Sequence, residues 1–212
     1  GLTTVETGRT HNFTYEVDDK PFGGKTDVPA WPEDALAHGA PQGQLTEKLI
    51  HQSKIYPGMQ SNYWVYAAAG YNPSVPAALM VWQDGEVNVD RAAVSHTLNV
   101  IDNLTAKKQI PVIVHVFISP GFVDGKPMRS IEYDTLGDKY SRFLLEEVLP
   151  ELQKCCKLTD NPAGWAISGA SSGGICSFTV AWERPDKFGK VFSTIGSFTN
   201  IRGGIAYPYL IR

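Results

Sequence analysis

Residues 169–173 read GASSG and have the spacing G-x-S-x-G, which is typical of a sharp turn that presents a nucleophilic serine. The glycines allow a strand and the following helix to approach closely, and the hydroxyl group of Ser171 is then forced outward. An activated serine in such a turn attacks the carbonyl carbon of an ester and forms an acyl-enzyme. The alternative is a small-residue turn that only packs a strand against a helix. The flanking segments decide between the two, because a nucleophile needs a strand before it and a helix after it.

Both flanking elements are indicated by the sequence. The run GWAIS, residues 164–168, predicts a short strand, and SSGGICSFTVAWERPDKF, residues 171–188, predicts a helix that ends near Pro185. The pentapeptide thus lies in the context that favours a catalytic Ser171.

The rest of residues 46–212 alternates short apolar runs with helical patterns. Further strands are predicted at 77–85, 111–121 and 190–198, and helices at 93–109 and 138–156, the second with a kink at Pro150. Residues 47–73 predict an antiparallel edge hairpin around Pro57-Gly58. This alternation predicts an α/β fold, a three-layer sandwich with a mostly parallel sheet covered on both faces and an N-terminal antiparallel hairpin.

Composition limits the remaining possibilities. The chain has 212 residues, of which 42% are hydrophobic, and this suggests one domain preceded by an irregular arm over residues 1–45, where Gly, Pro, Asp and Thr are frequent. A net charge of −3 without a Lys/Arg cluster argues against a nucleic-acid partner, and no apolar run has the length of a membrane span. The cysteines Cys155, Cys156 and Cys176 do not have the spacing of a disulfide framework or a zinc site, and we expect them to be small buried residues.

Three stretches carry a family resemblance: residues 63–85, 129–152 and 167–204. They resemble the esterase family of α/β-hydrolases, which includes enterochelin, feruloyl and acetylxylan esterases, S-formylglutathione hydrolases and mycolyltransferases. The similarity is greatest to the enterochelin-esterase-like branch and covers about residues 45–212. It implies the α/β-hydrolase fold and serine-dependent hydrolysis of carboxylic esters. No metal or organic cofactor is expected, because an oxyanion hole performs the task of a Lewis acid.

Acyl transfer needs two backbone N–H donors for the oxyanion of the tetrahedral intermediate. We expect one donor at Ser172, directly after the nucleophile, and the resemblance implies that the second is Glu86, which follows Asp84-Gly85. The resemblance also places Asp84 where relatives contact substrate hydroxyl groups. A carboxylate that braces its own loop is the alternative for Asp84.

The segment RSIEY, residues 129–133, matches a recurrent element of the same branch, on the loop before the long helix. The guanidinium of Arg129, the carboxylate of Glu132 and the phenol of Tyr133 could bind a polar or anionic substrate. They could equally form a structural salt bridge and aromatic packing around the serine turn.

A general base is missing from the expected place. In α/β-hydrolases the acid and then the histidine follow the serine along the chain, but all five histidines, His11, His38, His51, His96 and His115, precede Ser171. Glu183 and Asp186 follow the serine too closely to be the triad acid. We therefore expect the chain to be the N-terminal portion of a longer hydrolase, with the base and the acid beyond residue 212. A segment on another chain, a catalytically incomplete fragment and a non-catalytic binding module that keeps the fold are the alternatives.

The resemblance implies a polar ester as substrate, either a carbohydrate-linked acetyl or feruloyl ester or a siderophore-type ester. The relatives also favour a secreted or periplasmic location. The oligomeric state is left open by the sequence.

Overall fold

The centre of the molecule is a mixed β-sheet. The computed structural model describes residues 4, 11–26, 39–93 and 95–211, and in them nine strands form this sheet. Along the sheet lie β11 (Lys190–Thr194), β10 (Trp165–Ala170), β6 (Ala78–Trp82), β7 (Ile113–Ile118), β5 (Gln60–Ala67), β8 (Phe122–Val123) and β9 (Lys126–Pro127), and the short β3 (Gln44–Leu45) and β4 (Leu49–Gln52) also pair with β5.

The predicted mixture of strand directions is confirmed. The strands β11, β10, β6 and β7 are parallel neighbours, whereas β5 runs antiparallel to β7 and to β4. The β4–β5 pair is the hairpin that was expected around Pro57-Gly58. Because the parallel strands point the same way, the loops that follow β6, β7 and β10 meet at one edge of the sheet.

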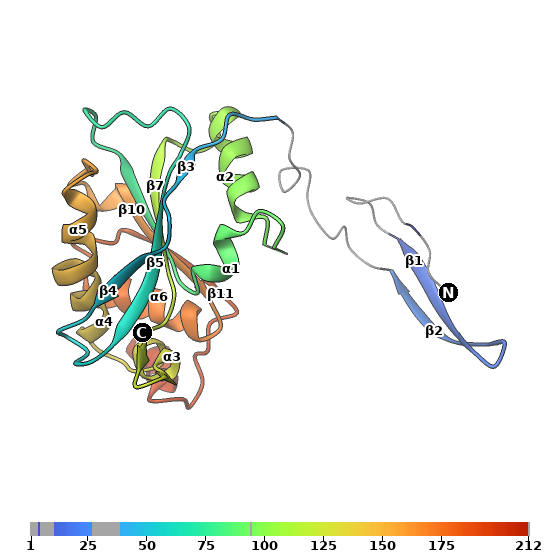
Figure 1. The fold of residues 1–212 in the computed structure, drawn as a ribbon. Coiled ribbons are helices and arrows are strands. Elements are labelled where there is room, and N and C mark those ends of the chain that lie inside the picture. Colours follow the sequence, from blue (N-terminus) through green and yellow to red (C-terminus); the bar gives the residue numbers. More distant parts are fainter. Residues whose placement is uncertain (1–3, 5–10, 27–38, 94, 212) are drawn as a thin grey trace.

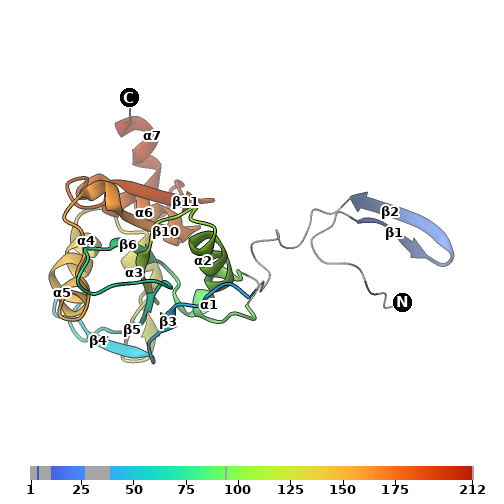
Figure 2. The ribbon, with the colours of Figure 1, turned by 90° about the horizontal axis from the view of Figure 1, so that it is seen from above.

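Helices cover both faces of the sheet (Figures 1 and 2). The helical bounds are α1 (Glu86–Val89), α2 (Thr97–Ala106), α3 (Arg129–Tyr133), α4 (Lys139–Arg142), a π-helix (Phe143–Val148), α5 (Leu149–Gln153), α6 (Ser172–Glu183) and α7 (Tyr207–Leu210), with 3₁₀ turns at Pro162–Gly164 and Gly204–Ala206. One core cluster joins the sheet to α4, the π-helix, α5 and α6, and a second cluster joins the opposite face to α2. The fold is therefore the three-layer α/β-hydrolase sandwich that was predicted.

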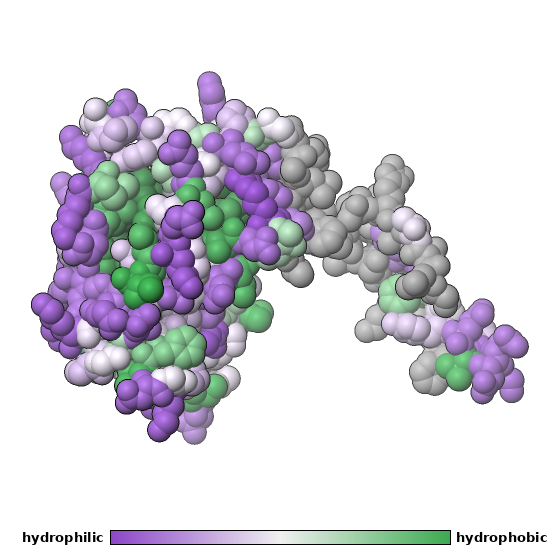
Figure 3. All heavy atoms as spheres, in the orientation of Figure 1, coloured by the Kyte–Doolittle hydropathy of each residue, from purple (hydrophilic) through white to green (hydrophobic). Residues whose placement is uncertain are grey.

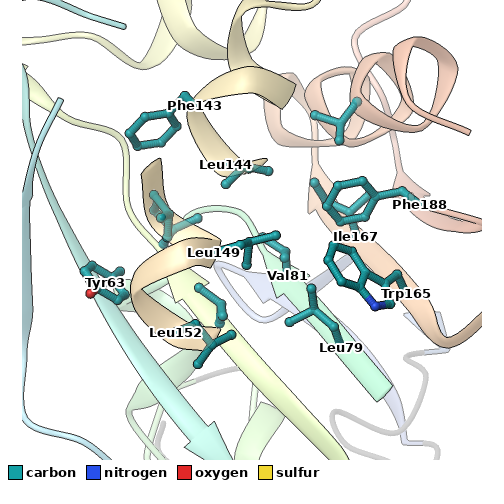
Figure 4. Packing of buried hydrophobic residues seen from close by; sticks show 14 of the residues in the cluster. Tyr63, Leu79, Val81, Phe143, Leu144, Leu149, Leu152, Trp165, Ile167 and Phe188 are labelled. Carbon is teal, nitrogen blue, oxygen red and sulfur yellow. The ribbon is translucent and has the colours of Figure 1, made fainter. Parts of the chain in front are cut away.

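The larger core cluster consists of side chains from strands and from the long helical segment (Figure 4). Leu144 and Leu149 face Val81 and Ile167 of the sheet, whereas the ring of Phe143 packs against Tyr56 and Tyr140, and all of these side chains are buried. The apolar stripe along residues 138–156 is confirmed. A π-helix ends at Val148, two residues before Pro150, and its wider turn accommodates a residue that has no N–H to donate, whereas the kink itself stays a prediction.

The predicted irregular arm over residues 1–45 is wrong for two stretches. Strands β1 (Asn12–Val17) and β2 (Lys20–Thr26) form an antiparallel hairpin, and β3 already belongs to the central sheet. The hairpin turn places Asp18 and Asp19 at φ values of 51° and 58°, a pair of positive angles that suits a two-residue hairpin loop. The remainder of the predicted arm, residues 1–3, 5–10 and 27–38, lies outside the described residues.

The surface is mixed in polarity. In the view of Figure 3, hydrophilic side chains cover most of the face, with apolar patches between them. Within the described part of the chain, no helix combines the length and the apolar character needed to cross a membrane.

Candidate active site

Ser171 lies at the junction of β10 and α6 in an unusual backbone conformation. Its φ is 56° and its ψ is −120°, a region that residues with a Cβ atom rarely adopt, and its side chain is exposed. Surrounding backbone contacts fix this conformation. The N–H of Ser171 donates to the carbonyl of Thr194 at 3.0 Å, and its own carbonyl accepts the N–H groups of Gly174 and Ser197, both at 3.0 Å.

The flanking glycines are required by close approaches. A Cβ atom added at Gly169 would lie 2.4 Å from the carbonyl oxygen of Gly173. One added at Gly173 would lie 3.1 Å from Cβ of Gln83 and 3.2 Å from Oδ2 of Asp84. The small residues thus let β10, α6 and the loop after β6 pack together around the serine, as the pentapeptide predicted.

The hydroxyl group of Ser171 lies 3.1 Å from the hydroxyl group of Ser197, in the loop after β11. The contacts described for Ser171 do not include a histidine. Sequence reasoning missed Ser197, because no spacing rule connects it to the pentapeptide.

The described hydrogen bonds of His51, His96 and His115 are to residues other than Ser171, and that of His96 joins Nδ1 to the carbonyl oxygen of Arg91 at 3.1 Å. His115 is buried in β7 and accepts the indole N–H of Trp82 on Nδ1 at 3.0 Å, and burial lowers the pKa of its imidazole to about 3. The Nε2 atom of His51 lies 3.1 Å from Glu147. His38 lies outside the described residues. His115 is therefore the neutral core histidine that its strand pattern suggested.

Ser172 is the first residue of α6, and the N–H of such a residue has no intrahelical partner. The positive end of the helix dipole lies at the same place. An oxyanion formed next to Ser171 would therefore meet both a free donor and a favourable field at the start of this 12-residue helix.

The second predicted donor is already engaged. The N–H of Glu86, at the start of α1, donates to the hydroxyl group of Ser119 at 3.1 Å. The two preceding N–H groups are engaged too. The N–H of Asp84 donates to the Tyr133 hydroxyl at 3.1 Å, and the N–H of Gly85 donates to the carbonyl of Ile118 at 2.9 Å. Sequence reasoning did not find Ser119, although its position directly after β7 puts it at the same edge of the sheet as Glu86.

Asp84 and Arg129 form a bidentate ion pair. Both nitrogen–oxygen distances are 2.8 Å, and the side chains are 26% and 39% exposed. The hydrogen bonds from Arg129 to Asp84 raise the pKa of the guanidinium above its usual value, and the Cζ atom of Arg129 lies 5.2 Å from the ring centroid of Tyr133. The pair connects the loop after β6 to α3 and still presents part of its surface to solvent.

Glu132 and Tyr133 lie beneath this pair, and each is 1% exposed. Oε2 of Glu132 accepts the N–H of Gly121 at 2.7 Å, Oε1 has no hydrogen-bond partner among the described residues, and burial raises the pKa of the carboxyl group to about 7. Burial also raises the pKa of the Tyr133 phenol well above its ordinary value. Because both side chains are covered, the structure favours the alternative of packing and hydrogen bonding around the serine turn for these two residues, and direct substrate contact by them stays a prediction. The expected loop around them is the short helix α3.

Gln83 was not singled out by the sequence. It is buried, its backbone N–H donates to the carbonyl of Ser168 at 2.8 Å, and its side-chain oxygen accepts the Tyr140 hydroxyl at 2.7 Å. These bonds tie the end of β6 to β10 and to α4. In the described part of the chain, no group of three or more His, Cys, Asp and Glu side chains could hold a metal ion.

Comparison with known proteins gives matches to esterases. Residues 57–199 match the family described as "Putative esterase". The iron(III) enterobactin esterase of Dickeya dadantii (strain 3937) is 24% identical over 154 residues, which cover 72% of this chain and 32% of that protein.

Solved structures give the same fold. The enterobactin esterase FES from Shigella flexneri superposes with a TM-score of 0.66 at 21% identity, covering 93% of this chain and 47% of that one. The ferulic acid esterase AmCE1/Fae1A of the anaerobic fungus Anaeromyces mucronatus superposes with a TM-score of 0.59 at 18% identity, covering 76% and 62%. The chain thus spans about a third of the curated relative and about half of the bacterial structure.

Proposed function

Since this chain belongs to the esterase family, we propose that it hydrolyses carboxylic esters through an acyl-enzyme on Ser171. The observation that carries the proposal is the backbone of Ser171, held at φ 56° between β10 and α6 with its side chain exposed. Such strain costs about 1–3 kcal/mol and persists where a mechanism uses it. A turn that served packing alone would be more stable without it.

In the proposed reaction the Ser171 oxygen attacks the ester carbonyl carbon, and its proton passes to a general base. The C–O bond to the alcohol then breaks, and the base returns the proton to the leaving alcohol. Water attacks the acyl-enzyme in the same way and releases the carboxylic acid and the free serine. Each step passes through a tetrahedral oxyanion that needs two donors.

We assign these donors to the N–H groups of Ser172 and Glu86. The first is supported by its place at the start of α6. The second now bonds to the Ser119 hydroxyl at 3.1 Å, and a negatively charged oxyanion is a stronger acceptor than a neutral hydroxyl group. Ser119 therefore holds the Glu86 donor in place until the oxyanion displaces it.

The base histidine and the triad acid are proposed to lie outside residues 1–212. Two facts support this: the described partner of the Ser171 hydroxyl is Ser197, and the solved bacterial relative is about twice as long as this chain. An unactivated serine is a weak nucleophile. Residues 1–212 alone should therefore react far more slowly than the protein that also contains the base.

The proposed substrate is a polar ester of the kind named for the relatives, enterobactin or a ferulic acid ester. The partly exposed Asp84 and Arg129 would contact hydroxyl or anionic groups of the substrate at the rim of the site. Glu132 and Tyr133 would act through them, as positioning residues beneath the ion pair.

The test is steady-state and burst kinetics of the natural protein on p-nitrophenyl acetate, a feruloyl ester and enterobactin. Ser171→Ala should reduce turnover by roughly 10⁴-fold or more, as loss of a serine nucleophile does. The matched control Ser74→Ala, an exposed serine in the loop before β6, should leave turnover unchanged. Tight substrate binding without turnover would instead support a non-catalytic binding module, and full activity of Ser171→Ala would remove the serine from the mechanism.

A further inference from the structure

The consecutive residues Cys155 and Cys156 lie in the turn directly after α5. Both of their N–H groups donate to the carbonyl of Leu152, at 3.1 and 2.9 Å. Cys155 is exposed, whereas Cys156 is buried at 8% exposure. The expectation that every cysteine is a buried small residue is therefore wrong for Cys155.

The two sulfur atoms are close to each other. Their separation is 3.6 Å, and the Cys155 thiol also donates to the carbonyl of Leu152 at 3.2 Å. Both thiols are free. The third cysteine, Cys176, is 1% exposed inside α6. Of the three, Cys155 is thus the thiol that a dissolved reagent reaches, and it has a second thiol beside it.

We propose that Cys155-Cys156 is a redox-sensitive dithiol that closes to a disulfide by exchange with small-molecule disulfides. In the first step the Cys155 thiolate attacks one sulfur of the small disulfide, which forms a mixed disulfide and releases one small thiolate. In the second step the Cys156 thiolate attacks the Cys155 sulfur and expels the second small thiol. The protein is oxidised by two electrons, and one small disulfide is reduced to two thiols.

The order of the two steps follows from the surroundings of the thiols. Burial raises the pKa of Cys156 to about 11, so this thiol is a poor nucleophile toward a dissolved reagent at neutral pH. Once Cys155 carries the mixed disulfide, the second attack is intramolecular and gains from a high effective concentration. The exposed residue therefore reacts first, and its buried neighbour resolves the intermediate.

The resulting bond should be easy to reduce again. Consecutive Cα atoms are about 3.8 Å apart, which is below the roughly 4.4–6.8 Å that is usual for a disulfide. Strained disulfides have more oxidising potentials and belong to the labile, regulatory kind. The pair thus suits a reversible response to the thiol–disulfide balance of its surroundings and not a structural cross-link.

The turn that would change shape is tied to the central sheet. Directly after the two cysteines, the carbonyl of Lys157 accepts the N–H of Ala77 at 2.9 Å. Leu158 forms a parallel β-bridge with Ala77 as well. Ala77 precedes β6, whose other end leads to Asp84. Formation of the disulfide between Cys155 and Cys156 would therefore strain the turn that holds the start of β6.

The test uses the full chain with oxidised glutathione and measures the intact mass without reductant. Wild-type protein should become lighter by two hydrogen atoms, and dithiothreitol should reverse the change. Cys156→Ser should stop at one bound glutathione, because nothing resolves the mixed disulfide. Cys155→Ser should react at least about tenfold more slowly, because the remaining thiol is buried with a raised pKa.

Phenylarsine oxide, which bridges neighbouring thiols, gives an independent readout: it should bind the reduced protein and lose binding after oxidation. Three results would overturn the proposal. The first is wild-type protein that stops at one bound glutathione, as Cys156→Ser is expected to do. The second is a disulfide that joins two chains, and the third is oxidation that occurs only when denaturant is present. If a variant fails to fold, non-reducing peptide mapping of the oxidised wild-type protein still decides whether Cys155 and Cys156 are linked.

Discussion

The carboxyl group of Glu132 shows how burial beneath the site changes the chemistry of a single residue. It receives one hydrogen bond, from Gly121, and lies in an environment that disfavours its charged form. Its pKa is raised to about 7, so between about pH 4.5 and 7 the folded protein binds a proton that the unfolded chain has lost. The stability that this group contributes is complete below pH 4.5, decreases as the pH rises from 4.5 to about 7, and no longer changes above the folded pKa.

Replacing Glu132 by Gln should remove this dependence, because the amide oxygen still accepts the Gly121 N–H and cannot ionise. We expect Glu132→Gln to gain stability relative to wild type between pH 4.5 and 8, by about 2–3 kcal/mol in the free energy of unfolding. Urea denaturation across this pH range measures the difference. The exposed Glu183→Gln is the control, and a difference between Glu132→Gln and wild type that does not change with pH would contradict the assignment.

At the scale of elements, one carboxylate attaches the π-helix to the hairpin at the edge of the sheet. Glu147 accepts four hydrogen bonds from residues 51–55: the His51 ring at 3.1 Å, the Ser53 hydroxyl at 2.7 Å, and the backbone N–H groups of Lys54 and Ile55 at 2.8 and 2.9 Å. Burial acts to raise the pKa of Glu147, but these hydrogen bonds together lower it below its usual value.

Glu147→Gln should therefore destabilise the protein by about 1–3 kcal/mol at pH 7. The amide oxygen can still accept the N–H groups of Lys54 and Ile55, but the NH₂ group replaces the oxygen that bonds to the Ser53 hydroxyl and the His51 ring, and the negative charge that strengthens all four bonds is lost. A lowered pKa in the folded state means that the wild-type advantage is present above the unfolded pKa and is lost as the pH falls through the folded one. Thermal unfolding at pH 7 and pH 3 tests both statements. The neighbouring Glu146→Gln, which loses an exposed pair with Arg142, should cost little at either pH.

The elements were largely predictable because their signals are local. Continuous apolar runs indicated β7 and β10, and small residues at fixed spacing indicated the turn at Ser171. The hairpin β1–β2 was missed because its Asp18-Asp19 turn lacks the glycine that usually accompanies positive φ angles.

The candidate site was less predictable, because contacts between distant segments determine it. The bond from Glu86 to Ser119 joins residues 33 positions apart, and the pair of Asp84 and Arg129 joins residues 45 apart. The burial of Glu132 depends on packing that no local pattern records. Residue types therefore predicted the kind of chemistry, whereas the role of each side chain followed from the fold.

At the scale of the whole molecule, β11 forms one end of the sheet of described strands. Phe192 on this strand is 63% exposed and Ile195 just after it is 80% exposed. An edge strand with exposed apolar side chains offers unpaired backbone groups to another chain. We expect residues 1–212 alone to self-associate as the concentration rises.

Phe192→Lys should reduce this association, because a charged side chain on an edge strand disfavours pairing. Sedimentation velocity over a concentration series measures the effect, and Phe13→Lys on the β1–β2 hairpin serves as the control. If residues 1–212 stay monomeric at every concentration, or if both variants associate equally, β11 is not the strand through which the chains associate.

The central claim is that Ser171 is the nucleophile of an esterase whose base lies outside residues 1–212. The most direct measurement is the intact mass of the natural protein before and after reaction with a fluorophosphonate, followed by peptide mapping. We predict a chain heavier than 23.2 kDa that gains one adduct on Ser171, and no adduct in Ser171→Ala. A chain of 23.2 kDa that gains no adduct, or an adduct on another residue, would contradict the claim.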